Sequence, residues 1–201
     1  MTIEVFADIW CPFAHVGLRA ARAARDAGGW DVPIVVRAWP LELVNGAPMD
    51  PSKTRHHIED LHAQIDAPMF ADLADPFPTS TLPALALVRR AYRCDARLGE
   101  RASFLIRDAL FEHGQDISDP EVLAGLADEL GCGLPDDEDR AGVLADWDDG
   151  TRRGVKGSPH FFNGDDQMFC PLLDISRDAN SHLVIREQTQ RLTEFLAANF
   201  G

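Results

Sequence analysis

The sequence has no apolar run that approaches the ~20 residues needed to cross a bilayer. Its first residues also lack a basic segment followed by a long apolar one, so we expect no signal peptide and a cytoplasmic protein. Basic residues are scarce: 19 Lys and Arg stand against 33 Asp and Glu, which gives a net charge of -14. A surface this acidic repels phosphate backbones and anionic lipids, so we expect neither nucleic acid nor a membrane as partner.

Cysteine is also scarce, and no two cysteines form a Cys-x-x-Cys pair. The four are Cys11, Cys94, Cys132 and Cys170. None is grouped with histidine at zinc-ligand spacing, and a reducing cytosol should keep most of them as free thiols. Three histidines lie close together in the sequence, at His56, His57 and His62. No carboxylate or cysteine spacing typical of a metal site accompanies them, so we expect no metal.

The chain further lacks a nucleophile-elbow serine, a phosphate-binding loop and a dinucleotide fingerprint. What it has is an ordinary globular composition, with 45% hydrophobic and 26% charged residues among 201. This length and mix exclude a disordered chain and are sufficient for one core with a subdomain.

The N-terminal part predicts a strand, a helix and a second strand. Residues 3–9 alternate and are rich in β-branched and aromatic side chains, as is typical of a strand. Pro12 follows at a position that favours the first helical turn, and the helix predicted over 13–27 ends at a Gly-Gly pair. Residues 32–39 are again strand-like, so we expect a βαβ unit with a right-handed crossover.

Helical periodicity dominates the middle of the chain, with breaks at Pro, Gly and Asp. Helices are predicted over 82–98, 101–113 and 136–147. The residues from Ser118 to Glu121 have the cap chemistry that begins another helix. We interpret residues 46–151 as a helical insertion.

The C-terminal part returns to β structure. Residues 159–162 and 167–169 flank Asn163-Gly164, a pair that strongly favours a hairpin because both residues tolerate positive φ. Residues 183–199 are predicted to form a closing amphipathic helix.

Cys11 is the residue that points most directly to chemistry, because it lies where a strand ends and a helix begins. Unpaired backbone N–H groups and the helix dipole favour a thiolate there and should lower the pKa of the cysteine. A thiolate is the nucleophile in disulfide exchange. The structural alternative is a buried cysteine that only caps the helix, and the local context leaves both open.

Two segments resemble a known family. Residues 8–17, Asp-Ile-Trp-Cys-Pro-Phe-Ala-His-Val-Gly, resemble the active-site segment of the DsbA-like, FrnE-type branch of the thioredoxin superfamily. Residues 154–159, Gly-Val-Lys-Gly-Ser-Pro, resemble the cis-proline loop of that branch. The helical insertion lies between them, as in the family. The resemblance implies an α/β thioredoxin fold, with a thioredoxin-like domain formed by residues 1–45 and 152–201 and a helical insertion at 46–151.

The resemblance also assigns roles to single residues. Cys11 matches the nucleophile, Pro159 matches the cis-proline that packs against it, and Ser158 would offer backbone groups to an extended substrate. Ala14 replaces the second cysteine of the family. Without that sulfur, Cys11 can form a mixed disulfide but cannot close the short ring within the motif.

Three ways of completing the chemistry remain open. A low-molecular-weight thiol could resolve the mixed disulfide. Cys170 could resolve it instead, because the strand that returns to the active-site face should end there; otherwise Cys170 is a small buried apolar residue. Finally, the site could bind a thiol cofactor, as in the related kappa-class glutathione transferases and 2-hydroxychromene-2-carboxylate isomerases, which have Ser at the first position of the motif.

Several neighbours are candidates for contact with substrate or cofactor. The expected apolar walls are Trp10, Phe13, Phe161 and Phe169, and Pro12 and Ser158 complete the near contacts. His15 would supply an imidazolium to the thiolate, or it is an ordinary helix histidine. Arg153, with Arg152 and Lys156, would bind the carboxylates of a thiol cofactor, or these cations complement a helix end.

The preferred function is therefore a thiol–disulfide oxidoreductase with Cys11 as its single attacking thiolate. A thiol-dependent isomerase or transferase and a non-catalytic binding module are the alternatives. We expect no tightly bound cofactor, and a low-molecular-weight thiol of the glutathione or mycothiol type as co-substrate. The expected partners are a disulfide-bearing protein or a small thiol substrate, and a homodimer is left open.

Overall fold

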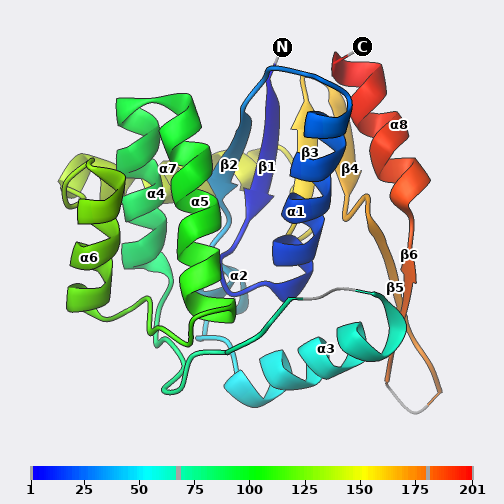
Figure 1. The fold of residues 1–201 in the computed structure, drawn as a ribbon, viewed down its shortest axis with the longest axis horizontal. Coiled ribbons are helices and arrows are strands. Elements are labelled where there is room, and N and C mark those ends of the chain that lie inside the picture. Colours follow the sequence, from blue (N-terminus) through cyan, green and yellow to red (C-terminus); the bar gives the residue numbers. More distant parts are fainter. Residues whose placement is uncertain (1, 67–68, 180–181, 201) are drawn as a thin grey trace.

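The computed structural model describes residues 2–66, 69–179 and 182–200. Its centre is a four-stranded sheet in the order β2-β1-β3-β4 (Figure 1). The strands are β1 (Ile3–Ala7), β2 (Ile34–Ala38), β3 (His160–Asn163) and β4 (Asp166–Phe169). β1 pairs in parallel with β2 and antiparallel with β3, and β3 pairs antiparallel with β4. The N-terminal and C-terminal strands thus form one sheet, as the resemblance implied.

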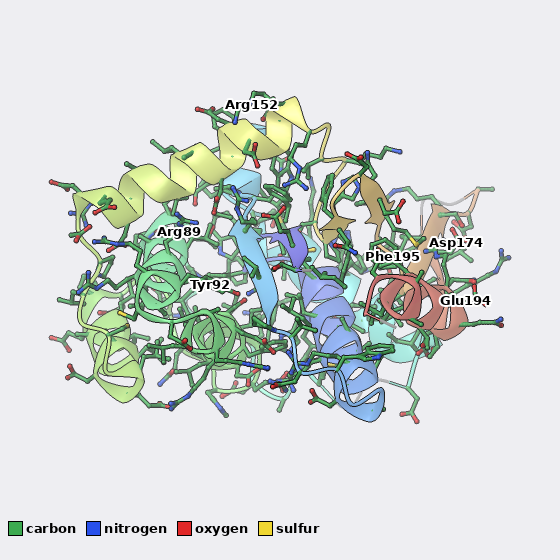
Figure 2. The ribbon with its side chains drawn as sticks, turned by 90° about the horizontal axis from the view of Figure 1, so that it is seen from above. Arg89, Tyr92, Arg152, Asp174, Glu194 and Phe195 are labelled. Atoms are coloured by element: carbon green, nitrogen blue, oxygen red, sulfur yellow. The ribbon has the colours of Figure 1, made fainter. Side chains whose placement is uncertain are left out.

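Helix α1 (Pro12–Ala27) connects the parallel strands β1 and β2, which confirms the predicted βαβ unit. Pro12 lies in its first turn, where a backbone N–H would have no acceptor within the helix, so the N–H that proline lacks is not missed. Helices α1 and α8 (Thr189–Phe200) contact each other on one face of the sheet, and α7 (Asp137–Arg152) lies across the opposite face (Figure 2). Helices therefore cover both faces of the sheet, as in an α/β fold.

The middle of the chain is helical, as predicted. The remaining helices are α2 (Leu41–Asn45), α3 (Pro51–Gln64), α4 (Leu82–Cys94), α5 (Ala96–Phe111) and α6 (Pro120–Leu130). Asp119 caps α6, and Asp136 forms a capping box with Asp139 at the start of α7. No helix in the described ranges is long and apolar enough to span a membrane. The division into a thioredoxin-like domain and an insertion stays a prediction, because α5 and α7 pack directly on β2.

β2 is an edge strand whose outward N–H groups are satisfied by helix side chains. Tyr92 on α4 accepts from the Val36 N–H at 2.8 Å and donates to the Ile34 carbonyl at 2.9 Å. Glu100 and Asp146 accept from two further N–H groups of the same strand. Covered in this way, the edge offers no pairing surface to another chain.

The C-terminal region confirms one expectation and corrects another. β3 and β4 form the predicted hairpin, with Gly164 at a φ of 58° in its turn. Residues 183–199, however, are not one helix: β6 (Leu183–Glu187) pairs with β5 (Leu173–Arg177) in a second, two-stranded sheet, and α8 begins only at Thr189. The reason is the period-two burial of β6, in which Leu183 and Ile185 are buried and the residue between them is less so.

Candidate active site

The thiol of Cys11 lies between the end of β1 and the first turn of α1, against the proline loop. Its Sγ donates a hydrogen bond to the carbonyl oxygen of Ser158 at 3.1 Å. The peptide bond between Ser158 and Pro159 is cis. The structure therefore brings together the two segments that carried the resemblance, and only 4% of the Cys11 surface remains exposed.

Asp8, directly after β1, ties the loops around Cys11 to one another. Its backbone N–H donates to Ser158 Oγ at 3.0 Å, and its carboxylate accepts from the backbone N–H groups of Trp10 and Leu41. Its carbonyl oxygen accepts from the buried Arg107 guanidinium at 3.1 Å. The β1–α1 loop, the segment after β2 and the proline loop are thereby fixed relative to the thiol.

Burial raises the pKa of the Cys11 thiol, which corrects the expectation that the helix start would lower it. The Ser158 hydroxyl and the N–H of Ala14 act in the opposite direction, and the charge of Asp8 adds to the increase. Burial likewise raises the pKa of the Asp8 carboxyl, to about 6. Desolvation outweighs the helix dipole here because the thiolate would be almost cut off from water.

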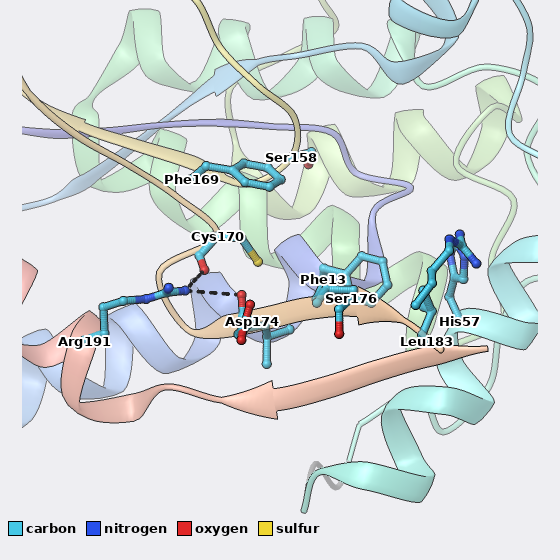
Figure 3. A pocket seen from close by; sticks show the side chains of 12 residues that line it. Phe13, His57, Ser158, Phe169, Cys170, Asp174, Ser176, Leu183 and Arg191 are labelled. Atoms are coloured by element: carbon cyan, nitrogen blue, oxygen red, sulfur yellow. Dashed lines mark hydrogen bonds between the residues drawn. The ribbon is translucent and has the colours of Figure 1, made fainter. Parts of the chain in front are cut away.

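A cavity of about 510 Å³ opens beside the proline loop (Figure 3). Residues of α1, α3, the proline loop, the end of β4, the second sheet and α8 line it: Phe13, His57, Ser158, Phe169, Cys170, Leu173, Asp174, Ile175, Ser176, Arg177, Leu183 and Arg191. Cys11 is not among these residues, but its hydrogen-bond partner Ser158 is. The thiol therefore does not line the cavity itself, but it contacts a residue that does.

Cys170 follows β4 and does reach the proline loop, where its N–H donates to the Pro159 carbonyl at 2.9 Å. It has a φ of 44°, and its sulfur points into the cavity in Figure 3. Arg191 of α8 holds this segment by donating to the carbonyl oxygens of Cys170 and Pro171 at 2.6 and 2.8 Å. Burial, followed by the charge of a Cys11 thiolate, raises the pKa of Cys170 to about 12, and both sulfurs are free thiols.

Only two of the four expected aromatic walls line the cavity, Phe13 and Phe169. Trp10 is fully buried and stacks on Phe77, with ring centroids 6.2 Å apart. Phe161 is fully buried and contacts Phe195 of α8, with ring centroids 6.3 Å apart. Pro12 is buried in the first turn of α1. Trp10, Phe161 and Pro12 are therefore core residues behind the site.

His15 is not the imidazolium that the sequence suggested. Its ring is fully buried, its Nε2 lies 2.8 Å from Glu112 Oε1, and burial lowers its pKa. Burial alone would raise the pKa of Glu112, but hydrogen bonds from His15 and from the N–H groups of Phe70 and Ala71 hold it at about 2. His15 thus connects α1 to the end of α5, and it does not line the cavity.

Arg153 also lies away from the cavity, which corrects its expected role in binding a cofactor carboxylate. Its guanidinium donates to Glu4 at 2.5 Å and lies over the rings of Phe6 and Phe162, with distances to the ring centroids of 5.3 and 4.2 Å. These partners are on the face of the sheet that α7 covers. The alternative interpretation, a cation that completes a helix end, fits this position.

Sequence reasoning missed the residues that the second sheet and α3 contribute, His57, Asp174 and Arg191 among them. The alternation of Leu173, Ile175 and intervening polar residues could have predicted β5. Nothing local could have shown that the imidazole of His57 faces Phe13, with ring centroids 5.3 Å apart.

Comparison with known proteins agrees with this fold. The family model of the DSBA-like thioredoxin domain matches residues 2–177. No curated protein shows significant similarity to the sequence.

Three solved structures share the fold. A candidate protein disulfide isomerase from Nitrosomonas europaea is 18% identical, covers 98% of this chain and 96% of its own, and has a TM-score of 0.70. The cytosolic disulfide reductase DsbM from Pseudomonas aeruginosa with GSH is 18% identical, with 98% of both chains covered and a TM-score of 0.68. A 2-hydroxychromene-2-carboxylate isomerase is 16% identical, covers 98% of this chain and 94% of its own, and has a TM-score of 0.61. The match over residues 2–177 shows that this chain belongs to the DSBA-like thioredoxin domain family.

Proposed function

We propose that this protein is a thiol–disulfide oxidoreductase in which Cys11 is the single attacking thiolate. The Cys11 sulfur attacks one sulfur of a substrate disulfide, forms a new S–S bond and releases the other sulfur as a thiolate, which takes up a proton. A low-molecular-weight thiolate then attacks the mixed disulfide, leaves with the substrate sulfur as a new disulfide, and frees Cys11. Each cycle therefore releases one substrate sulfur as a thiol and leaves the other joined to the small thiol, and attack by a second small thiol on that disulfide completes the two-electron reduction of the substrate.

The observation that carries this proposal is the contact between the Cys11 thiol and the carbonyl preceding cis-Pro159, at 3.1 Å. Ser158 lines the cavity, and we propose that an extended chain or a small thiol reaches the Cys11 sulfur from there. Ala14 is fully buried one turn away and has no sulfur, so the second attack has to come from another molecule or from Cys170.

Glutathione-type thiols are the proposed co-substrate, and a disulfide-bearing protein or small molecule is the proposed substrate. The structure of the reductase DsbM was determined with GSH. In this chain the cavity is lined by the cationic side chains of Arg177 and Arg191, whose charge favours the carboxylates of such a thiol. A cytosolic location stays part of the proposal, because thiols of this kind are kept reduced there.

The test is reduction of a glutathionylated peptide in the presence of glutathione and a glutathione-recycling system. We expect turnover by the wild type and none above background by Cys11→Ser. Cys94→Ser, which changes an exposed cysteine at the end of α4, serves as the matched control and should retain full activity. Equal rates for the wild type and Cys11→Ser would refute the proposal.

One observation favours a second candidate, a thiol-dependent isomerase or transferase. Burial raises the pKa of Cys11, and a neutral thiol is better suited to contact a bound thiol cofactor than to attack a disulfide as a thiolate. In that case activity would require added glutathione and survive Cys11→Ser, whereas ligand binding without turnover would indicate a binding module.

A further inference from the structure

The β5–β6 hairpin packs against α3 (Figure 1). Both contribute residues to the cavity wall. The Gln64 side chain joins them like an additional peptide group: its Nε2 donates to the Leu183 carbonyl and its Oε1 accepts from the Ile185 N–H, both at 2.9 Å. This fixes the start of β6 against the helix. His182, the residue before β6, lies beside the exposed His56 of α3, with ring centroids 6.0 Å apart.

Three potential metal ligands meet at this junction. His56 and Asp60 are one turn apart on α3 and share a face of the helix. One ligand atom from each of His56, Asp60 and His182 lies within 4.8 Å of the other two. The distance between His56 Nε2 and Asp60 Oδ2 is 4.0 Å. A zinc ion lies about 2.0–2.2 Å from nitrogen and carboxylate ligands, so two of its ligands are separated by at most about 4 Å. Small rotations of the two exposed histidines would close the remaining difference.

Two further observations indicate a cation here. Asp60 Oδ2 is buried and has no hydrogen-bond partner within the described residues, a costly state for a carboxylate oxygen. His56 Nδ1 lies 3.4 Å from Glu59 Oε2, so a carboxylate lies beside the ring nitrogen that is not the one nearest Asp60. Metal-binding histidines characteristically have a carboxylate on the other ring nitrogen.

We propose that His56, Asp60 and His182 form a binding site for a divalent transition-metal ion, with zinc as the expected occupant. Two imidazoles and one carboxylate match the ligand preference of zinc, and solvent would complete its coordination. The ion would link α3 to the β5–β6 hairpin. Since His57 and Leu183, the neighbours of two ligands, line the cavity, it would also stiffen the cavity wall. This proposal is independent of the chemistry of Cys11, and it reverses the expectation of no metal that the histidine spacing alone had suggested.

The test is calorimetric titration of tag-free, chelator-treated protein with zinc, with a parallel Co²⁺ titration to read the ligand set from its absorption. We expect one tight equivalent, a cobalt spectrum without the charge-transfer band of thiolate ligands, and a melting temperature that rises with zinc. Replacement of one ligand, in His56→Ala or His182→Ala, should weaken zinc binding by about tenfold or more and remove the thermal shift.

His62→Ala is the matched control, because His62 is on the same helix and its ring contacts the Met69 carbonyl instead. It should bind zinc like the wild type. Absence of a tight equivalent in the wild type, unchanged binding in both ligand variants, or an equal loss in His62→Ala would each overturn the proposal. Both ligand histidines are exposed, so their replacement leaves the core intact; circular dichroism of the zinc-free variants checks this.

Discussion

The Cys11 thiol and the Ser158 carbonyl oxygen, 147 positions apart in the chain, are joined by a 3.1 Å hydrogen bond. The bond favours the neutral thiol, because a thiolate has no proton to donate. Burial acts in the same direction. The hydrogen bond that positions the sulfur therefore also opposes ionisation of the thiol. A substrate that breaks this hydrogen bond, or lets water reach the sulfur, would ease deprotonation.

The first prediction concerns the ionisation of Cys11. Because burial raises its pKa, the rate of its modification by a small methanethiosulfonate should rise with pH to a midpoint above the unperturbed value of about 8.5. Mass spectrometry of the Cys11 peptide provides the measurement, and the exposed Cys94 is the accessible reference in the same sample. A midpoint at or below about 8.5 would show that the helix dipole dominates after all.

The second prediction concerns Cys170. With its pKa raised to about 12, this thiol supplies little thiolate near neutral pH, so Cys170→Ser should keep most of the glutathione-dependent turnover. Mild oxidation of the wild type should likewise give few Cys11–Cys170 peptides. Loss of turnover in Cys170→Ser together with an abundant linked peptide would instead identify Cys170 as the resolving thiol.

The third prediction is a pH dependence of stability that originates in Glu112. Its pKa is about 2 in the folded protein and about 4.5 when unperturbed, so its ionised form stabilises the fold fully above pH 4.5. That contribution, on the order of 2 kcal/mol, is lost as the pH falls from 4.5 toward 2. Urea unfolding of the wild type and Glu112→Gln should differ clearly at pH 7 and much less at pH 3. A difference independent of pH would contradict this assignment.

The fourth prediction compares two helix glycines. A Cβ on Gly150 of α7 would lie 2.7 Å from the Trp39 ring and 3.0 Å from that of Phe6, whereas a Cβ on Gly125 of α6 meets nothing within 4 Å. Gly150→Ala should lower the free energy of unfolding by about 1–2 kcal/mol, because overpacking outweighs the gain in helix propensity. Gly125→Ala should raise it by about 0.5–1 kcal/mol. Thermal and urea unfolding measure both, and stabilisation by Gly150→Ala would show that α7 can move off the sheet.

The sequence by itself determined the local elements around the site. Pro12 after a β-rich segment specified where α1 begins, and Asn163-Gly164 specified the hairpin that follows the proline loop. These signals act through the backbone conformations of neighbouring residues, so they can be read without a fold. The two motifs of the resemblance identified the family for the same reason, because each lies within about ten consecutive residues.

Only the tertiary structure decided how those residues behave. Whether Cys11 is ionised depends on how much water reaches it, and segments far away in the sequence control that access. His15 became the partner of Glu112, and Arg153 that of Glu4, because packing put a carboxylate beside each of these side chains. Likewise, His182 joins His56 only because β6 pairs with β5 and packs on α3. Desolvation and long-range contact are properties of the assembled core, and no local pattern encodes them.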